Sequence, residues 1–357
     1  MKKSRAGKGG DGTGQEKLPA AIPQIDILKG LAIIAVVLLH ALPFSFFLLI
    51  GSPYHIWHAI PLFILIAGFT GAYAYKRYGS KTLKECYNPS LLIRRFSRLL
   101  VPFLLCWCIE LCILFSLNQL PSNSVSLIFD LMRGGYGWGA YFVPVILQSV
   151  IFVPLLYLLA VRNPNRMVII ALFLTLLFDA VSIVLGWDPG TTSVLYFPYM
   201  FAGALGVWIA ISAKTDKRWL ILGGGISLVY LTLSCYTPLF SSFPNYSGYS
   251  GVLQAPAFMW TVILALAGLR YLPKKIESLP SRYIGELGKA SWHIFLTQLI
   301  YYWTPAAFVY TWIAAPMDFG SVIIGDALVV ILNLCICLPV GYSWYTLEKR
   351  ISRALQK

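Results

Sequence analysis

Asp26-Ile-Leu-Lys29-Gly-Leu-Ala-Ile-Ile-Ala-Val-Val-Leu-Leu-His40 is the beginning of the first long apolar run of this chain. The run is typical of a membrane-spanning helix, but it carries a lysine near its start and a lone histidine 11 positions later. In an α-helix this spacing places Lys29 and His40 on one face, about 16 Å apart along the axis. Hydrocarbon penalises an ionisable side chain that lacks a partner or a wet cavity, so His40 is a functional candidate.

The helix face that carries these two residues is predicted to line one cavity. Imidazole suits the role of a base there, because it takes up a proton near neutral pH. A histidine in a membrane helix can instead serve packing, through a hydrogen bond to a neighbouring helix. The predicted cavity stripe consists of Asp26, Lys29, Ile33, Val37 and His40.

The composition indicates an all-α polytopic membrane protein. Of the 357 residues, 58% are hydrophobic and only 12% are charged, and the apolar runs are too long and too frequent for a soluble core. The net charge of +14 then concerns membrane topology, and no basic face with interleaved aromatic residues favours nucleic-acid binding. The seven cysteines show no metal-finger spacing and are predicted to be small buried hydrophobes.

Hydropathy predicts ten membrane-spanning helices with both termini in the cytoplasm. This arrangement puts every lysine and arginine except Arg133 in a cytoplasmic segment, as the positive-inside rule requires. An added or missing helix would scatter these charges over both sides of the membrane. The predicted spans are residues 25–50, 56–75, 97–118, 138–160, 166–186, 194–213, 218–237, 252–271, 290–314 and 320–346.

The expected layout is one membrane domain with two tails. Residues 1–24 are rich in Lys and Gly and are predicted to be a flexible basic cytoplasmic tail. Residues 25–347 form the transmembrane domain, and residues 348–357 form a cytoplasmic C-terminal tail. The first apolar run is too long for a cleavable signal and lacks a small-residue cleavage site, so the chain is expected to stay in the cell membrane, surrounded by lipid.

Three arginines mark the cytoplasmic start of the third predicted span. Arg94-Arg95-Phe-Ser-Arg98, with Lys29 on the same side of the membrane, offers a dense group of cations. Guanidinium groups bind phosphates bidentately, so this cluster is a candidate phosphate site. The same residues could anchor the helix at lipid headgroups, and the sequence leaves both interpretations open.

The outer loops carry aromatic, hydroxyl and amide groups on a Gly-rich backbone. Such groups suit stacking on sugars and hydrogen bonding to them, although an interfacial aromatic belt has the same composition. The candidate residues on this outer side are His58, Asp130, Arg133 and Trp138.

Glu110 lies within the third predicted span, deep enough to meet a histidine at mid-membrane, and needs a partner or a cavity there. His55 and His58 are one helical turn apart, but no third ligand has suitable spacing, so no metal is expected. No Walker loop, Rossmann glycine pattern or Gly-x-Ser-x-Gly elbow is present, which disfavours an ATP-driven pump and a serine hydrolase.

Several ordered segments carry a family resemblance. They are Ile25-Asp-Ile-Leu-Lys29-Gly-Leu-Ala with the following His40, His58-Ala-Ile-Pro61-Leu-Phe-Ile-Leu-Ile-Ala-Gly68, Arg95-Phe-Ser-Arg98, and Leu287-Gly-Lys-Ala-Ser291-Trp-His-Ile-Phe-Leu-Thr-Gln298, followed by Glu348-Lys-Arg350. In this order the chain resembles integral-membrane acyltransferase family 3, the polytopic O-acyltransferases of surface polysaccharides and related glycans. The resemblance extends from residue 25 to about residue 350.

The resemblance implies an acyl-CoA donor, most often acetyl-CoA, that enters from the cytoplasm, and a hydroxyl acceptor on a surface glycan or a related small molecule. It implies that Lys29, Arg95 and Arg98 hold the phosphates of the donor, with Arg94 as a helper. The rise of about 16 Å along the first helix then suits an extended pantetheine arm that reaches His40. His40 would act as general base or carry the acyl group.

The chain departs from the family pattern at two positions. Members usually have arginine where Lys29 stands, and many have histidine where Gln298 stands, so no catalytic role is assigned to Gln298. A transporter or flippase for a lipid-linked sugar is the main alternative function, although no pair of broken helices or inverted repeat is visible. A non-catalytic assembly partner is a third alternative.

Overall fold

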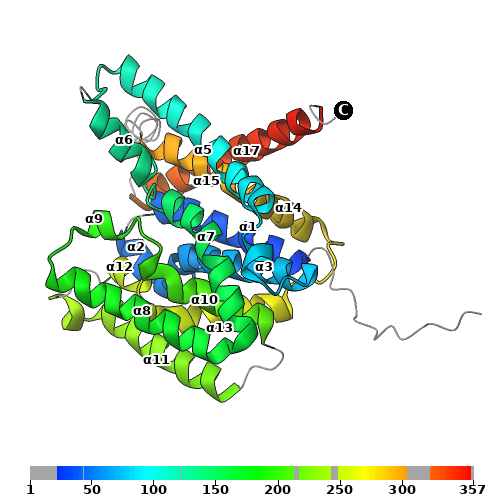
Figure 1. Cartoon of the computed structure of the whole chain (residues 1–357). Coiled ribbons are helices and arrows are strands. Elements are labelled where there is room, and N and C mark those ends of the chain that lie inside the picture. The colour runs from blue at the N-terminus through cyan, green and yellow to red at the C-terminus, as the bar shows by residue number, and fades with distance from the viewer. Residues whose placement is uncertain are drawn as a thin grey trace, which may run out of the picture.

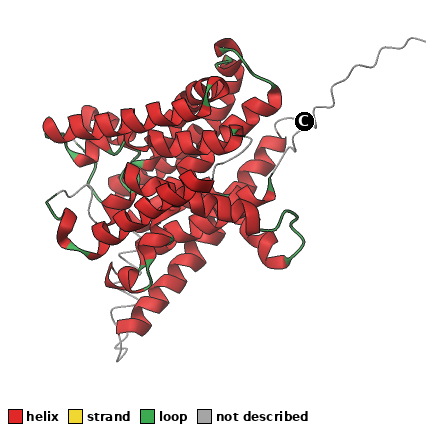
Figure 2. Cartoon of the chain, turned by 90° about the horizontal axis from the view of Figure 1, so that it is seen from below, coloured by secondary structure: helices red, strands yellow, loops and turns green. Residues whose placement is uncertain are grey.

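A computed structural model describes residues 22–42, 44–121, 123–212, 217–242, 248–303 and 322–354. All regular structure in these ranges is helical, which confirms the predicted all-α class (Figures 1 and 2). Most of the predicted N-terminal tail and the second half of the ninth predicted span lie outside the described residues.

Seven helices of the described chain are long and apolar enough to cross a membrane. They are Pro23–Ala41 (α1), Ser52–Tyr78 (with α3 at Ala59–Tyr78), Leu83–Ser116 (with α5 at Pro89–Ser116), Phe142–Arg162 (α7), Pro164–Val184 (α8), Lys217–Tyr236 (α11) and Ala327–Ala354 (within α17, Val322–Ala354). Two shorter apolar helices cover Phe197–Ile211 (with α10 at Met200–Ile211) and Ala255–Tyr271 (with α13 at Phe258–Tyr271), and α15 is described at Ser291–Trp303. The protein is a membrane protein, while the count of ten spans and the location of the termini stay predictions.

The first predicted span is shorter than expected. Pro23 occupies the first turn of α1, where its missing amide costs nothing. The helix ends at Ala41 because Leu42 adopts an extended conformation, as a residue before a proline prefers. The predicted span 25–50 is therefore divided, and the short helix α2 (Phe44–Leu49) follows α1.

The third span begins earlier than predicted. The Asn88 side chain accepts a hydrogen bond from the Ser90 amide and caps α5, and Pro89 fills the first helical position. The three arginines of the candidate phosphate site consequently lie inside this helix rather than ahead of it.

Two amphipathic helices occupy segments that were expected to be loops. α6 (Ser124–Arg133) lies in the outer segment 119–138 and is capped by Asn123. α14 (Leu279–Lys289) lies in the segment 270–289 and is capped by Ser278. Capping and one apolar face stabilise a short helix without making it a membrane span.

α1 lies at the centre of the helix assembly (Figure 1). It contacts α3 and α13 on one side and α14, α15 and α17 on the other. Ile33 and Val37 on this helix have no solvent exposure. A helix enclosed in this way holds both of its ends in fixed positions relative to the surrounding helices.

Glycines allow the closest helix crossings. At Gly206 of α10, a Cβ atom would overlap the carbonyl oxygen of Leu65 on α3, and at Gly68 a Cβ would overlap the carbonyl of Gly203. Small residues let helix backbones approach closely in this manner, and van der Waals contact then replaces the hydrophobic effect as the driving force in lipid. The α3 to α10 crossing is therefore one of the rigid contacts of the fold.

Replacing Gly206 by alanine should destabilise the protein by about 1–3 kcal/mol, because the added Cβ forces the two helices apart. Gly225→Ala on α11 is the matched control, since a Cβ there meets nothing within 4 Å, and it should stabilise the helix by about 0.5–1 kcal/mol. Thermal unfolding of the purified variants in one detergent measures both. Equal midpoints for the two variants would contradict the close-contact explanation.

Candidate active site

His40 occupies the last turn of α1, and its ring faces aromatic side chains. The ring centroids lie 6.2 Å from Trp138 and 5.4 Å from Tyr302. The Tyr302 hydroxyl donates to the carbonyl oxygen of Val37 at 3.0 Å, so this neighbour is already committed to the backbone of α1. The imidazole makes no hydrogen bond to any residue that the structure describes.

A cavity of about 170 Å³ opens beside the imidazole. Its walls come from α1, from α3, from the loop before α7, from the short helix α12 (Gly248–Val252) and from α15. The lining residues are Val36, Leu39, His40, Ile60, Gly139, Tyr141, Tyr249 and Phe295. Apolar walls with one histidine and two tyrosine side chains can position a hydroxyl group near the imidazole while excluding most water.

A glycine-rich loop before α7 forms one wall of this cavity. Gly139 has a φ of 88°, which other residues rarely adopt, and a Cβ built on it would lie 3.6 Å from Nε2 of His40. Gly135 has a φ of 98°, and a Cβ there would overlap the Glu110 carboxylate. The loop thus passes close to His40 on one side and to Glu110 on the other.

Glu110 contacts this loop, and no hydrogen bond or ion pair joins it to a histidine among the residues that the structure describes. Its carboxylate is fully buried on α5, and it accepts a hydrogen bond from the backbone amide of Tyr136 at 3.3 Å. A buried carboxylate needs such donors, since burial without hydrogen bonds is costly. Glu110 therefore supports the loop that lines the cavity.

The remaining outer candidates, Asp130, Arg133 and Trp138, make hydrogen bonds or ring contacts in the same region. Asp130 accepts a hydrogen bond from the Tyr136 hydroxyl at 2.8 Å, and burial together with this bond raises the pKa of the Tyr136 phenol. Arg133 donates to the Thr191 hydroxyl at 3.3 Å. Trp138 is 63% exposed while its ring faces His40, so it stands at the border between the cavity and the exterior.

His58 lies away from the cavity that His40 lines. It is only 1% exposed, and its Nδ1 is hydrogen-bonded to the Thr261 hydroxyl at 2.8 Å. His55, the other member of the pair, contacts the carbonyl oxygen of Ile50 at 3.0 Å. Among the residues that the structure describes, no three His, Cys, Asp or Glu side chains gather as a metal site would require.

The predicted cavity stripe on α1 is closed in its middle. Ile33 and Val37 have no exposure, because they pack into the main hydrophobic core. The face therefore does not line one continuous cavity, in contrast to the prediction from helical periodicity. It carries a polar group at each end, Lys29 and His40, with packed side chains between them.

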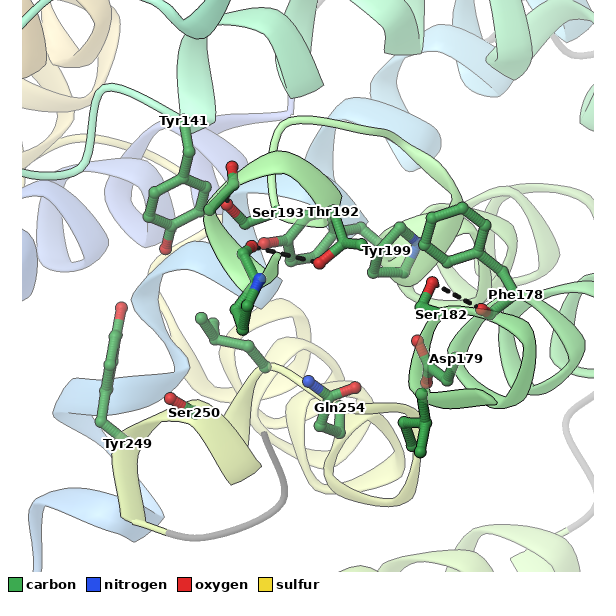
Figure 3. A pocket seen from close by; sticks show the side chains of 15 residues that line it. Tyr141, Phe178, Asp179, Ser182, Thr192, Ser193, Tyr199, Tyr249, Ser250 and Gln254 are labelled. Carbon is green, nitrogen blue, oxygen red and sulfur yellow. Dashed lines mark hydrogen bonds between the residues drawn. The ribbon is translucent and has the colours of Figure 1, made fainter. Parts of the chain in front are cut away.

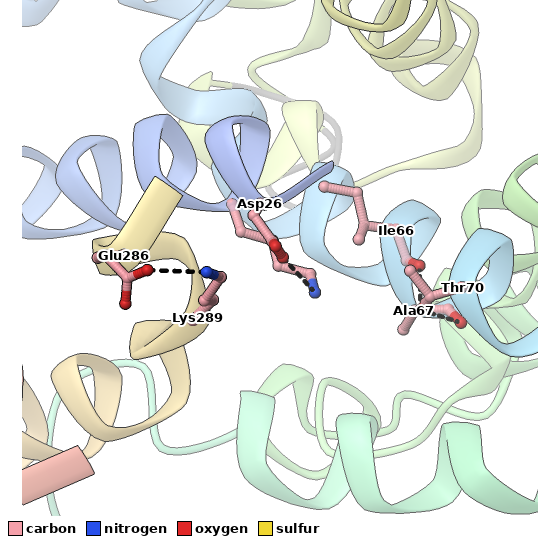
Figure 4. Close-up of polar contacts among 7 residues, drawn as sticks. Asp26, Ile66, Ala67, Thr70, Glu286 and Lys289 are labelled. Carbon is pink, nitrogen blue, oxygen red and sulfur yellow. Dashed lines mark hydrogen bonds and ion pairs between the residues drawn. The ribbon is translucent and has the colours of Figure 1, made fainter. Parts of the chain in front are cut away.

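A group of charged residues surrounds the first turns of α1, and we call Asp26, Lys29, Arg98 and Lys289 the rim cluster. Asp26 and Lys29 form an ion pair at 3.9 Å (Figure 4). Arg98 lies within electrostatic reach of Lys29, and Lys289 within reach of Asp26. Lys289 also bonds Glu286 at 2.8 Å, which raises the pKa of its ammonium group. With Glu286 counted, three cations face two acids, so an excess of one positive charge remains there.

The other two arginines differ from Arg98 in their surroundings. The Arg95 guanidinium donates to the Tyr75 hydroxyl at 2.7 Å and lies 4.5 Å from the centre of that ring. Tyr75 in turn donates to the Cys86 carbonyl at 3.2 Å. Arg94 is exposed on α5, as Arg98 is, but of these two only Arg98 lies within electrostatic reach of Lys29. Of the three arginines, the structure thus brings Arg98 to Lys29 and ties Arg95 to α3.

Sequence reasoning missed one polar pair. His293 on α15 bonds the Glu348 carboxylate on α17 at 2.7 Å, and His293 is only 6% exposed. Both residues belong to segments that were singled out for other reasons, the late apolar motif and the acid before Lys349. A histidine inside an apolar run was the available signal, but no local pattern joins residues so far apart in the chain.

Comparison with known proteins assigns the chain to a family. A family whose description reads "Acyltransferase domain" (Acyl_transf_3) matches residues 22–342, from the start of α1 into α17. Searches of curated proteins and of solved structures gave no match. The family assignment does not favour the transporter alternative. Because the match covers nearly the whole chain, the protein belongs to acyltransferase family 3 and is a membrane acyltransferase.

Proposed function

We propose that the protein moves an acyl group, most simply acetyl, from cytoplasmic acyl-CoA to a hydroxyl of a surface glycan or a related small acceptor. The observation that carries the proposal is the position of His40. Its imidazole has no hydrogen bond to a described residue and faces a cavity, at the opposite end of α1 from the rim cluster. One helix thus joins a cationic site to a free base.

The rim cluster supports the donor half of the proposal. Lys29, Lys289 and Arg98 would hold the phosphates of coenzyme A, and the Arg98 fork suits bidentate binding. Arg94 is exposed and would assist at the edge of the site. Arg95 would act by positioning α5, since its guanidinium is held by Tyr75.

The length of α1 supports a bridging role for the donor. Lys29 and His40 are about 16 Å apart along the axis, a distance of the order of an extended pantetheine arm. Ile33 and Val37 close the path between them, so donor binding has to separate α1 from a neighbouring helix. Helices that pack around the bound donor would protect its thioester from water.

In the proposed reaction the acceptor oxygen attacks the thioester carbonyl. A C–O bond forms, the C–S bond breaks and coenzyme A leaves as a thiolate. As general base, His40 takes the proton of the acceptor hydroxyl and then returns it to the thiolate. As a covalent carrier, the same nitrogen would form a C–N bond to the acyl group as the C–S bond breaks. The acceptor oxygen would then form the C–O bond as the C–N bond breaks, and the hydroxyl proton would pass to the released imidazole and on to the thiolate. Neither route needs a metal ion.

The expected setting is the cell membrane, with ten spans and both termini in the cytoplasm. This topology places the rim cluster on the cytoplasmic side, where acyl-CoA is available, and the His40 cavity toward the outer side. The segments 1–24 and 348–357 would then be cytoplasmic tails on either side of the membrane domain. α17 continues as a helix to Ala354, so most of the second tail would extend that helix.

Replacing His40 by alanine should lower acyl transfer by at least about 10²–10⁴-fold, because the proton acceptor is removed. Labelled acetyl-CoA and extracted glycan provide the assay, and coenzyme A binding with gel filtration shows that the variant is folded. His55→Ala is the matched control, since His55 is exposed and outside the cavity, and it should retain activity. Normal transfer by His40→Ala would remove this residue from the mechanism.

Replacing Lys29 and Arg98 together by alanine should weaken coenzyme A binding by roughly tenfold at low salt, and the difference should shrink as added salt screens the charges. Calorimetry at two ionic strengths measures this effect. Arg353→Ala, at the exposed end of α17, controls for net charge and should bind normally. If the double variant bound coenzyme A with unchanged affinity, the rim cluster would not be the donor site, and its positive charge would reflect membrane topology alone.

A further inference from the structure

A second and larger cavity lies next to the His40 cavity. Its volume is about 320 Å³, at the small end of the range of about 300–1,000 Å³ for ligand-binding cavities. It is built where α8 ends, around the short helices α9 (Pro189–Thr192) and α12 and the segment before α13. This position corresponds to the His40 end of α1.

Eight of the 15 described residues that line this cavity carry a hydroxyl or an amide group on an otherwise apolar wall (Figure 3). Ser193, Tyr199 and Gln254 face its interior, and the side-chain oxygen of Gln254 is buried with no hydrogen-bond partner in the described part of the chain. A buried acceptor without a donor is costly, so a ligand hydroxyl that donates to it would be favoured. Tyrosine rings beside such groups suit a sugar, which offers hydroxyls and an apolar face.

The one charged side chain among the described residues that line the cavity is acidic. Asp179 on α8 contributes an acidic side chain, and none of the described residues that line the cavity is a lysine, arginine or histidine. Arg133 reaches this region only at Thr191, which does not line the cavity. An anionic ligand would meet the like charge of the Asp179 carboxylate, which disfavours its binding.

Two tyrosines separate this cavity from His40. Tyr141 and Tyr249 line both cavities, and Figure 3 shows their phenol oxygens turned toward each other on the side opposite Asp179. They come from different elements, the start of α7 and α12, so movement of the short α12 would separate them. A hydroxyl group that passes between them enters the cavity beside the imidazole.

We propose that the larger cavity is the acceptor site and that it selects a hydroxyl-rich sugar unit without negative charge. The sugar lies between Asp179 and Gln254, and its reacting hydroxyl reaches His40 between Tyr141 and Tyr249. This inference rests on the proposed acyl transfer and adds the location and the charge preference of its acceptor.

Filling the cavity tests its location. Ser193→Trp should lower labelled acetyl transfer to extracted glycan by at least about tenfold, since an indole occupies much of the space, while coenzyme A binding stays unchanged. Ser241→Trp is the matched control, an exposed serine outside the cavity, and it should transfer normally. Normal transfer by Ser193→Trp overturns the site while leaving the proposed function intact. Absence of transfer by the unsubstituted protein overturns both.

If Ser193→Trp does not fold, Gln254→Leu tests the same cavity without added bulk. Loss of one hydrogen bond should raise the KM for the glycan by about 2–10-fold and leave coenzyme A affinity unchanged. An unchanged KM overturns the assignment of Gln254 to the acceptor site.

Defined acceptors test the charge preference. Methyl glucoside should be acetylated at least about tenfold more efficiently than methyl glucuronide, because only the latter places a carboxylate near Asp179. Asp179→Asn should reduce this preference by at least about threefold, since it removes the opposing charge and keeps the shape. Equal use of the two glycosides, or use of neither, overturns the proposed acceptor class.

Discussion

The enclosure of α1 by other helices is the constraint on which the rest of the structure depends. At Gly30 a Cβ would overlap the Ile284 carbonyl of α14, and at Gly288 a Cβ would overlap the Asp26 carbonyl of α1. These contacts fix α14 against the first turns of α1, and with it Lys289 beside Asp26. Since a helix is stiff along its axis, fixing one end also fixes the place of His40 at the other.

Glu110 is a second constraint, because it is a carboxylate buried in a membrane domain and needs hydrogen-bond donors there. Its hydrogen bond to the Tyr136 amide ties α5 to the glycine-rich loop, and the loop supplies the cavity wall at Gly139. Asp130 accepts a hydrogen bond from the phenol of the same tyrosine. One oxygen of the Glu110 carboxylate stays buried with no hydrogen-bond partner among the described residues, and the His40 imidazole makes no hydrogen bond to a described residue.

Much of the fold follows from local sequence, because apolar runs and helical periodicity report directly on spans and faces. The common face of Lys29 and His40 needs only the helix repeat. Hydropathy windows do not register caps or the effect of a proline, so they extend the first span past Ala41 and start the third one late. The Glu110 contact with the loop and the His293 bond to Glu348 join distant segments, and a single sequence does not contain that information.

The structure is closed by Ile33 and Val37 on α1 and by Tyr141 and Tyr249 between the two cavities, and these two closures differ in their physical character. In the proposed reaction, this difference affects how easily the donor and the acceptor enter. Ile33 and Val37 would close the donor side by packing, so opening it would expose apolar surface and cost free energy that the binding of a large ligand such as an acyl-CoA would repay. Tyr141 and Tyr249 would close the acceptor side with two hydroxyl groups, which a sugar hydroxyl could replace at little net cost. The barrier that costs less to open would then face the acceptor, and the one that costs more would face the thioester. A donor that opens its own path only on binding, next to an acceptor site with a low barrier, favours transfer to a sugar over loss of the acyl group to water.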